Sequence, residues 1–273
     1  MYENTSIRLQ AHKGYSTAAP ENTMAAFRAA CDAGFDFIEL DPKFTADGVC
    51  VLIHDWTINR TGRSTGHSAD GQALPPQTRM DALTYAELRE LDFGVWFGAE
   101  FAGERIPAFE EAIPYILSRG LSVKVDNVWE RFTPEQQEAL FALVRRIGAV
   151  HPETGARIGI TCARLENVER VARELPDAAI HFDGYVDHDA LAALDKYAAE
   201  RELYVWLRFH NEKTSWNKNP PVTAEYAALV KSHARLGVWL IDDEAEMPEV
   251  AGFEPFVVET NGGVKPGKRD ISL

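Results

Sequence analysis

The sequence has few cysteines and no long hydrophobic run, and each shortage excludes a class of protein. Its three cysteines, Cys31, Cys50 and Cys162, are odd in number and widely spaced, and no CxxC motif occurs. This pattern argues against a disulfide scaffold or a structural zinc site and is typical of a reducing compartment. No apolar run approaches the roughly 18 residues that indicate a transmembrane helix, so we predict no membrane insertion.

Positive charge is also scarce, which leaves the chain strongly acidic. Among 273 residues, 28 are Lys or Arg and 42 are Asp or Glu, so the formal net charge is −14 at pH 7. Binding to nucleic acid or to an anionic membrane surface needs a surplus of positive charge, so we predict neither partner. Residues 1–5 contain no basic segment leading into an apolar one, so we expect no signal peptide and a cytoplasmic location. The oligomeric state stays open.

The rest of the sequence alternates between short β-rich runs and helical patterns. The predicted strands are residues 7–11, 35–41, 121–126, 157–161, 179–183, 203–209, 237–241 and 256–259. The predicted helices are residues 22–33, 109–118, 134–147, 165–175, 187–201, 223–236 and 244–250. Eight strands joined by helices predict an α/β fold, a parallel sheet closed into a (β/α)8 TIM barrel. An open doubly wound sheet is the alternative, but neither GxGxxG nor GxxxxGK(S/T) occurs to support it.

Several helix boundaries carry their usual sequence signals. Thr133 followed by Pro134 indicates a helix start, because Pro is favoured at the first helical position. Gly120 and Gly237 are interpreted as residues that follow helix ends.

One stretch, from about residue 56 to residue 107, interrupts the alternation of strands and helices. It is rich in Gly, Thr, Ser and Pro, and contains one plausible short helix over residues 85–91. An additional β-rich run, residues 49–54, precedes it. We interpret the stretch as a small insertion after the second strand, within a single domain of residues 1–273, that overhangs one face of the barrel.

Acidic residues gather where the predicted strands end, which is where the active sites of TIM barrels lie. Glu39 and Asp41 are two residues apart, so both side chains point to one face of a strand. Two such carboxylates repel each other unless a cation lies between them, and Mg²⁺ or Ca²⁺ prefers oxygen ligands. The alternative is a solvent-exposed strand end, which the flanking apolar residues disfavour. Lys124 and Asp126 have the same spacing, so they too point to one face. They form either a plain ion pair or a site in which Lys124 binds an anion and Asp126 is a further metal ligand.

Two histidines, His12 and His54, each end an apolar run and precede a polar turn. Histidine titrates near neutral pH, so a pair can act as base and acid in one displacement. A lone histidine in such a place is more often structural, but two beside acidic residues favour catalysis. His181 lies inside an apolar strand and is predicted to belong to the core.

Motifs in the first half of the chain resemble those of the glycerophosphodiester phosphodiesterase family, in order and spacing. They are His12-Lys13-Gly14, Ala19-Pro20-Glu21-Asn22-Thr23, Ile38-Glu39-Leu40-Asp41, Thr45-x-Asp47-Gly48 and Ile53-His54-Asp55. Residues 91–107 are similar to the end of that family's insertion, so the resemblance covers residues 7–112; beyond them it is mainly the strand–helix rhythm. It implies a TIM barrel with an insertion after the second strand, one bound Ca²⁺ or Mg²⁺, and a histidine acid–base pair.

Carried over residue by residue, the resemblance also implies roles. Glu39 and Asp41 would be metal ligands, and His12 and His54 would be the general base and the general acid. Glu21 would lie beside the metal and the substrate in the loop after the first strand.

The chain departs from the family pattern at two places. Lys13 stands where the family usually has Arg, and Lys cannot form a fork onto phosphate oxygens. Lys124-x-Asp126 stands where the family usually has Glu-x-Lys, and we interpret this as Asp126 taking over metal ligation and Lys124 taking over phosphate contact. Glu259, near the last strand end, is predicted as another ligand or a substrate contact.

Aromatic residues near the sixth predicted strand are candidates for a leaving-group pocket. Trp206, Phe209 and Trp216 could contact a choline-like head by cation–π interaction. Packing inside the barrel is an equally weighted alternative for Trp206.

These residues together predict a metal-dependent phosphodiesterase that hydrolyses a small-molecule substrate, a glycerophosphodiester, to glycerol 3-phosphate and an alcohol. One alternative is an enzyme of the same scaffold that acts on another polar phosphodiester, such as a sugar-linked one, or that stops at a cyclic phosphate. Another is a non-catalytic binding barrel, which the presence of both histidines and both strand-end carboxylates disfavours. The sequence separates neither Ca²⁺ from Mg²⁺ nor attack by water from attack by a neighbouring hydroxyl.

Overall fold

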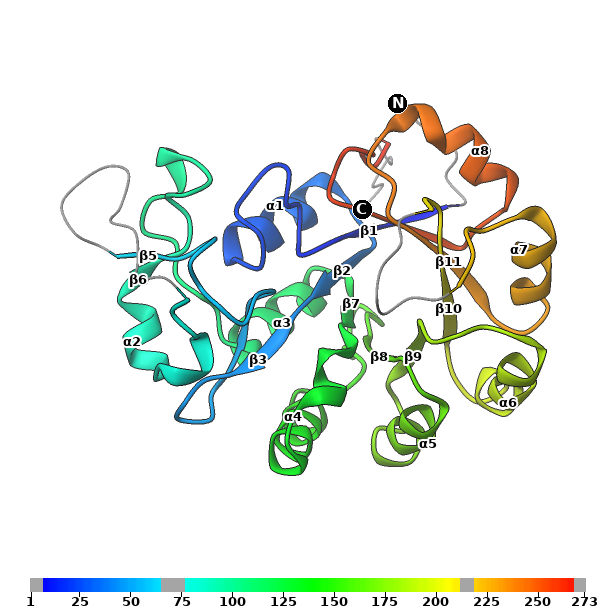
Figure 1. Ribbon diagram of the computed structural model, residues 1–273, viewed down its shortest axis with the longest axis horizontal. Coiled ribbons are helices and arrows are strands. Elements are labelled where there is room, and N and C mark those ends of the chain that lie inside the picture. Colours follow the sequence, from blue (N-terminus) through cyan, green and yellow to red (C-terminus); the bar gives the residue numbers. More distant parts are fainter. Residues whose placement is uncertain (1–6, 65–76, 212–218, 268–273) are drawn as a thin grey trace.

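The computed structural model describes residues 7–64, 77–211 and 219–267. Parallel strands close a barrel in the order β1-β12-β11-β10-β9-β8-β7-β2 (Figure 1). These strands are β1 (Arg8–Ala11), β2 (Phe37–Leu40), β7 (Ser122–Val125), β8 (Ile158–Cys162), β9 (Ala179–Phe182), β10 (Leu203–Arg208), β11 (Arg235–Trp239) and β12 (Val257–Thr260). The predicted eight-stranded TIM barrel is therefore confirmed.

Helices surround the barrel (Figure 1). They are α1 (Met24–Ala33), α3 (Phe109–Ser118), α4 (Pro134–Ile147), α5 (Leu165–Glu174), α6 (His188–Ala198), α7 (Ala224–Lys231) and α8 (Met247–Gly252). The 3-10 turns η3 (Asn127–Arg131) and η4 (Glu244–Glu246) follow β7 and β11. The start signal at Thr133 is confirmed, because its side chain and that of Gln136 form a capping box. In the described ranges, every helix falls short of the length or the apolar character needed to cross a membrane.

The boundary between α7 and β11 differs from the prediction. The helix ends at Lys231 and the strand begins at Arg235, whereas the sequence indicated a helix to residue 236 and a strand from residue 237. Leu236 pairs with Val205 of β10, so its apolar side chain belongs to the sheet and not to the helix. Gly237 lies inside β11 rather than after a helix, and the reason for glycine is space. A Cβ atom at Gly237 would lie 2.5 Å from the ring of Trp206.

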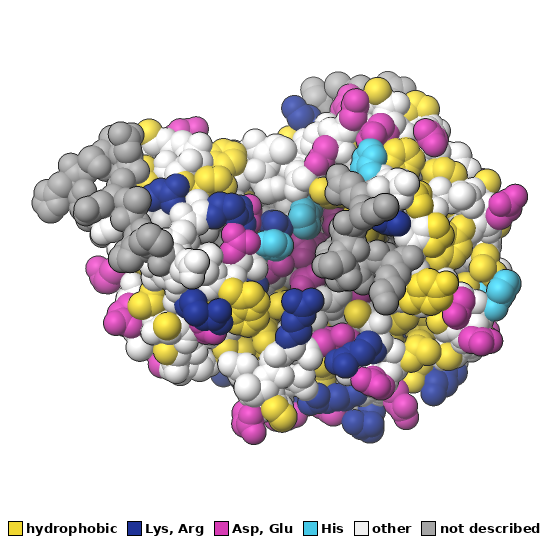
Figure 2. Space-filling model, in the orientation of Figure 1, with side chains coloured by type: hydrophobic (Ala, Val, Ile, Leu, Met, Phe, Trp, Pro, Cys, Tyr) yellow, Lys and Arg dark blue, Asp and Glu magenta, His cyan; other side chains and the backbone are white. Residues whose placement is uncertain are grey.

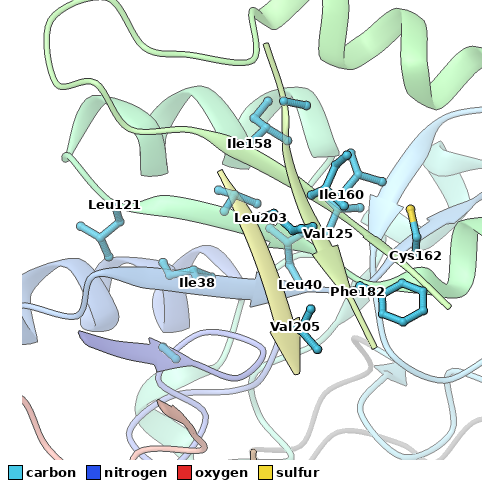
Figure 3. Packing of buried hydrophobic residues seen from close by; sticks show 14 of the residues in the cluster. Ile38, Leu40, Leu121, Val125, Ile158, Ile160, Cys162, Phe182, Leu203 and Val205 are labelled. Atoms are coloured by element: carbon cyan, nitrogen blue, oxygen red, sulfur yellow. The ribbon is translucent and has the colours of Figure 1, made fainter. Parts of the chain in front are cut away.

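Alternation along the strands separates an outer core from an inner one. Ile38 and Leu40 of β2 pack in the outer cluster between barrel and helices, which Figure 3 shows with Val125 and Ile160. Because successive strand residues point to opposite faces, Glu39 points into the barrel. The interior holds a smaller cluster of Phe37, Ala179, Tyr204, Trp206 and Val257. The strand pattern therefore determines which polar side chains reach the interior.

The predicted insertion after the second strand is present, and it lies to one side of the barrel in Figure 1. It begins at residue 42, earlier than expected, with an antiparallel pair formed by β3 (Pro42–Phe44) and β4 (Cys50–Leu52). Its other elements are β5 (Arg63–Ser64), η1 (Met80–Ala82), α2 (Tyr85–Arg89), β6 (Leu91–Asp92) and η2 (Ala99–Phe101). Its own apolar cluster comprises Val51, Ile53, Ile58, Met80, Leu88, Phe93 and Ile106. The predicted run over residues 49–54 thus belongs to the insertion.

The close contact at Gly237 generates a stability prediction. Gly237→Ala places a methyl group against the fully buried ring of Trp206, and such overpacking lowers the free energy of unfolding by about 1–3 kcal/mol. Thermal or urea unfolding measures the change. Gly252→Ala is the matched control, because a Cβ there meets nothing within 4 Å and the variant should be as stable as the unaltered protein. Equal stability of both variants would contradict the packing argument.

Candidate active site

A cavity of about 1020 Å³ opens at the carboxyl ends of the barrel strands. Figure 2 shows histidine and acidic side chains gathered in this hollow. The predicted site residues that line it are His12, Glu39, Asp41, His54, Lys124, Asp126, Trp206 and Glu259. Two other predicted site residues, Lys13 and Glu21, do not line this cavity. Trp216 lies outside the described residues, and the histidine predicted to be core, His181, is buried.

Three carboxylates meet at one corner of the cavity. Glu39, Asp41 and Asp126 each place one oxygen atom within 4.8 Å of the others. The parallel register explains this meeting, because Leu40 pairs with Val125 and the next residue of each strand follows side by side. The amide of Asn22 donates to Asp41 at 2.8 Å, and the backbone N–H of Lys13 donates to Glu39 at 3.1 Å.

Electrostatics makes this carboxylate triad (Glu39, Asp41 and Asp126) suitable for a hard cation. Burial and the neighbouring carboxylates hold the pKa of Glu39 well above its usual range. Burial and the charge of Asp41 likewise raise the pKa of Asp126. Asp41 is the exception, because the positive charges of His54, Lys43 and Lys13 outweigh its burial and lower its pKa. Oxygen ligands and uncompensated negative charge are what Ca²⁺ and Mg²⁺ require, so the residues present fit a divalent cation.

Lys124 lies level with Glu39 and two residues below Asp126, because it pairs with Glu39 in the register of β2 and β7. Its ammonium donates to Glu259 at 3.0 Å and lies 4.1 Å from the ring centroid of Trp206. Burial alone would lower the pKa of Lys124, but the charges of Glu259 and Glu39 raise it. Gln10 also donates to Glu259. Lys124 and Glu259 are therefore partners within the barrel.

Trp206 is fully buried in the inner barrel cluster, as the packing interpretation expected, and it also forms part of the cavity lining. Its indole N–H donates to Nδ1 of His181 at 2.9 Å. The His181 ring is held in place by stacking on Tyr204. Its role toward a substrate stays a prediction.

His12 is held at the mouth of the barrel by a chain of hydrogen bonds. Its Nδ1 lies 2.8 Å from Oδ1 of Asn261, and the amide of Asn261 donates to Asp242 at 2.6 Å. Because Asn261 presents its oxygen as an acceptor, Nδ1 of His12 carries the proton and Nε2 has a free lone pair. Nε2 lies 3.9 Å from Glu39, on the side of the triad. Asn261 and Asp242 follow predicted strand ends, which was the signal available in the sequence.

His54 follows β4 in the insertion, and its Nδ1 lies 2.7 Å from the carboxylate of Asp55. The ammonium of Lys43 donates to the backbone carbonyls of Ile53, at 2.8 Å, and of His54, at 2.5 Å. Both histidines therefore bind acceptors through Nδ1, which directs the tautomer with a free Nε2. Glu21, which the family resemblance placed beside the metal and the substrate, accepts two hydrogen bonds from Arg60.

Lys43, Asn127 and Asp183 are among the polar residues that line the cavity and that the sequence analysis missed. Lys43 continues the alternation of Glu39 and Asp41 along the chain, a signal that was available. Asp183 follows β9, and Asn127 follows β7 and donates to both oxygens of Asp183 at 3.0 and 2.8 Å. Burial raises the pKa of Asp183 to about 7.

These features define a TIM-barrel protein whose cavity combines a carboxylate triad with a pair of histidines. Residues 12–251 match the glycerophosphoryl diester phosphodiesterase family, and the chain belongs to this family. The resemblance of the sequence motifs is thereby confirmed.

Curated relatives match part of the chain. The glycerophosphodiester phosphodiesterase of Caldanaerobacter subterraneus is 40% identical over 116 residues, which cover 42% of this chain and 43% of the relative. Glycerophosphodiester phosphodiesterase 1 of Bos taurus is 38% identical over 118 residues, which cover 42% of this chain and 32% of the relative. The match spans less than half the length of these curated relatives.

Solved structures share the fold over nearly the whole chain. An Oleispira antarctica phosphodiesterase, in complex with its product sn-glycerol-3-phosphate, superposes with a TM-score of 0.70 at 21% identity, covering 94% of this chain and 93% of that chain. A glycerophosphodiester phosphodiesterase from Agrobacterium tumefaciens gives 0.63 at 20% identity, covering 94% and 97%. At this identity the likeness establishes the barrel fold.

The triad generates a prediction about metal and pH. Ca²⁺ or Mg²⁺ added to EDTA-treated protein should raise the thermal midpoint. At a cation concentration 100 times the dissociation constant, the free energy of unfolding should rise by about 2.7 kcal/mol. Protons compete with the cation for the triad, so the stabilisation shrinks as pH falls from about 7 to about 5. The raised pKa of Glu39 means that, without metal, its contribution to folding is favourable at low pH and is lost as pH rises. Differential scanning calorimetry at both pH values measures the effect.

Asp126 tests the triad itself. Asp126→Asn should weaken the calcium titration, because it removes one of the three anionic oxygen ligands. An unaltered titration would leave Asp126 as a structural charge that caps η3 through Val128.

Proposed function

We propose that this protein is a metal-dependent phosphodiesterase that hydrolyses glycerophosphodiesters to glycerol 3-phosphate and an alcohol. The observation that carries the proposal is the carboxylate triad and two histidines with free Nε2 atoms in one cavity, in a member of this family. Glu39, Asp41 and Asp126 would hold one divalent cation, Ca²⁺ or Mg²⁺. When bound, the cation would polarise the phosphoryl oxygens and offset the charge that develops on them.

His12 is proposed as the general base. Donation from its Nδ1 to Asn261 leaves Nε2 to remove a proton from the nucleophile. The nucleophile is water, or the neighbouring glycerol hydroxyl, in which case water opens the resulting cyclic phosphate in a second step. Asn261 holds the ring, and the bond also stabilises the imidazolium that forms.

His54 is proposed as the general acid. Its protonated ring gives the Nε2 proton to the oxygen of the leaving alcohol as the phosphorus–oxygen bond breaks. The Asp55 carboxylate stabilises the protonated ring before transfer. One proton is taken up by His12 and one released by His54, so exchange with solvent restores both residues for the next turnover.

Positive charge for the diester comes from lysines. Lys13 lies in the loop after β1, with its ammonium 3.7 Å from Glu21. The ammonium of Lys124 is bound to Glu259, so its proposed influence on phosphate is electrostatic and acts from beside Glu39. Both charges matter because a chain of net charge −14 repels an anionic substrate at long range.

A second candidate, hydrolysis of another polar phosphodiester such as a sugar-linked one, is favoured by Asn127 and Asp183. Their paired amide and carboxylate line the same cavity, and a carboxylate can accept hydrogen bonds from substrate hydroxyls. The experiment compares glycerophosphocholine with bis(p-nitrophenyl) phosphate, with and without EDTA. Turnover of the generic diester alone would favour the second candidate. Absence of metal-dependent turnover on both would favour a non-catalytic binding barrel.

The histidine roles generate a prediction on activity. His12→Ala and His54→Ala should each lower kcat on glycerophosphocholine by about 10²- to 10⁴-fold, the usual contribution of general acid–base catalysis. Thermal midpoints should stay near that of the unaltered protein, because both side chains are partly exposed. A steady-state assay of choline release measures the effect. Near-normal turnover by either variant would remove that histidine from the mechanism.

A further inference from the structure

Arg60, in the insertion, joins the proposed general acid to the first loop of the barrel. Its Nε donates to Oδ2 of Asp55 at 2.6 Å, and its two terminal nitrogens donate to the carboxylate of Glu21 at 2.6 and 2.7 Å. The other oxygen of Asp55 lies 2.7 Å from Nδ1 of His54. A continuous chain of charge-assisted hydrogen bonds therefore runs from Glu21 through Arg60 and Asp55 to His54.

The two ends of this chain differ in how firmly they are held. The side chain of Glu21 is 13% exposed, and the next residue, Asn22, donates to Asp41 of the triad. The side chain of His54 is 47% exposed and lies on the insertion, not on a barrel strand. Arg60 thus connects a more exposed side chain on the insertion to a more buried one in the first loop of the barrel. Its planar fork binds two carboxylates at once, which a lysine cannot do.

The two carboxylates in this chain of hydrogen bonds also keep their negative charge. Burial would raise the pKa of Asp55, but hydrogen bonds from Arg60 and His54 lower it to about 2. Burial of Glu21 is likewise outweighed by the hydrogen bond from Arg60 and the charge of Lys13, so its pKa falls below its usual value. Both carboxylates stay ionised and keep the guanidinium between them.

The backbone at His54 has a separate support. Lys43 binds the carbonyls of Ile53 and His54, whereas Arg60 acts only on side chains. Loss of Arg60 would therefore free the His54 ring to rotate, while the backbone at His54 keeps its position.

We propose that Arg60 is a positioning residue that, through Asp55, orients the His54 ring so that its Nε2 faces the leaving oxygen of the diester. The inference rests on the proposed role of His54 as general acid. It reassigns Glu21 from substrate contact to anchor of this chain.

The test exploits the difference between leaving groups. An alkoxide, as from glycerophosphocholine, needs a proton when it leaves, whereas p-nitrophenolate leaves without one. Arg60→Met should lower kcat on glycerophosphocholine by about 10- to 100-fold, part of the full general-acid contribution. KM should change less than about 2-fold, and kcat on bis(p-nitrophenyl) phosphate should fall by a much smaller factor. Glu21→Gln should show the same pattern more weakly, which keeps the test valid if Arg60→Met folds poorly.

Arg89→Met is the matched control. Arg89 lies in α2 of the same insertion and pairs with Glu111 at 3.8 Å, so removing it tests the general effect of losing an arginine–carboxylate pair there. It should retain both activities.

A double-mutant cycle separates positioning from a merely structural role. If Arg60 acts through His54, Arg60→Met should have no further effect on glycerophosphocholine turnover in a His54→Ala background. An additional loss there, or equal losses on both diesters in the single variant, would overturn the proposal. Failure of the proposed function would look different, because the unaltered protein would then fail to hydrolyse glycerophosphocholine.

Discussion

Repulsion among three carboxylates in one buried corner is the constraint on which the rest of this site depends. Glu39, Asp41 and Asp126 are brought together by the register of β2 and β7, and one oxygen of each lies within 4.8 Å of the others. The surrounding donors are arranged around this excess of negative charge, from the amide of Asn22 to the backbone of Lys13. A divalent cation is the partner that such an arrangement suits best.

The same register explains how a chain with Lys124-x-Asp126 can still form a triad. A shift of two strand residues moves a side chain by about 6–7 Å, which would remove a ligand from a fixed metal position. Asp126 follows directly after β7 and lies beside Asp41, at the mouth of the barrel. Lys124 lies two residues below it, where Glu259 from β12 neutralises its charge. The position of Lys124 therefore depends on a partner contributed by the far end of the sequence.

The sequence was sufficient to predict features that depend on a repeating pattern or on neighbouring residues. Strand alternation predicted the barrel and the shared face of Glu39 and Asp41, and motif order predicted the family. It failed where a side chain depends on a distant partner. Gly237 resembled a helix terminator, yet its role is to leave room for Trp206. The contact between Glu21 and Arg60 was not predicted, because nothing local in the sequence indicates that Arg60 folds back onto Glu21.

The two histidines are held by different parts of the fold, His12 by the barrel and His54 by the insertion. His12 extends from β1 and is fixed through Asn261 and Asp242, which follow β12 and β11, so its support is the rigid sheet itself. His54 depends on Asp55 and on a hydrogen-bonded bridge across to the first loop. The base side of the proposed reaction is thus tied to the barrel, while the acid side is carried by the insertion. A change at Arg60 can therefore retune how the leaving alcohol is protonated without removing a contact of the triad, because the carboxylates take their positions from β2 and β7 and accept hydrogen bonds from Asn22 and the backbone of Lys13.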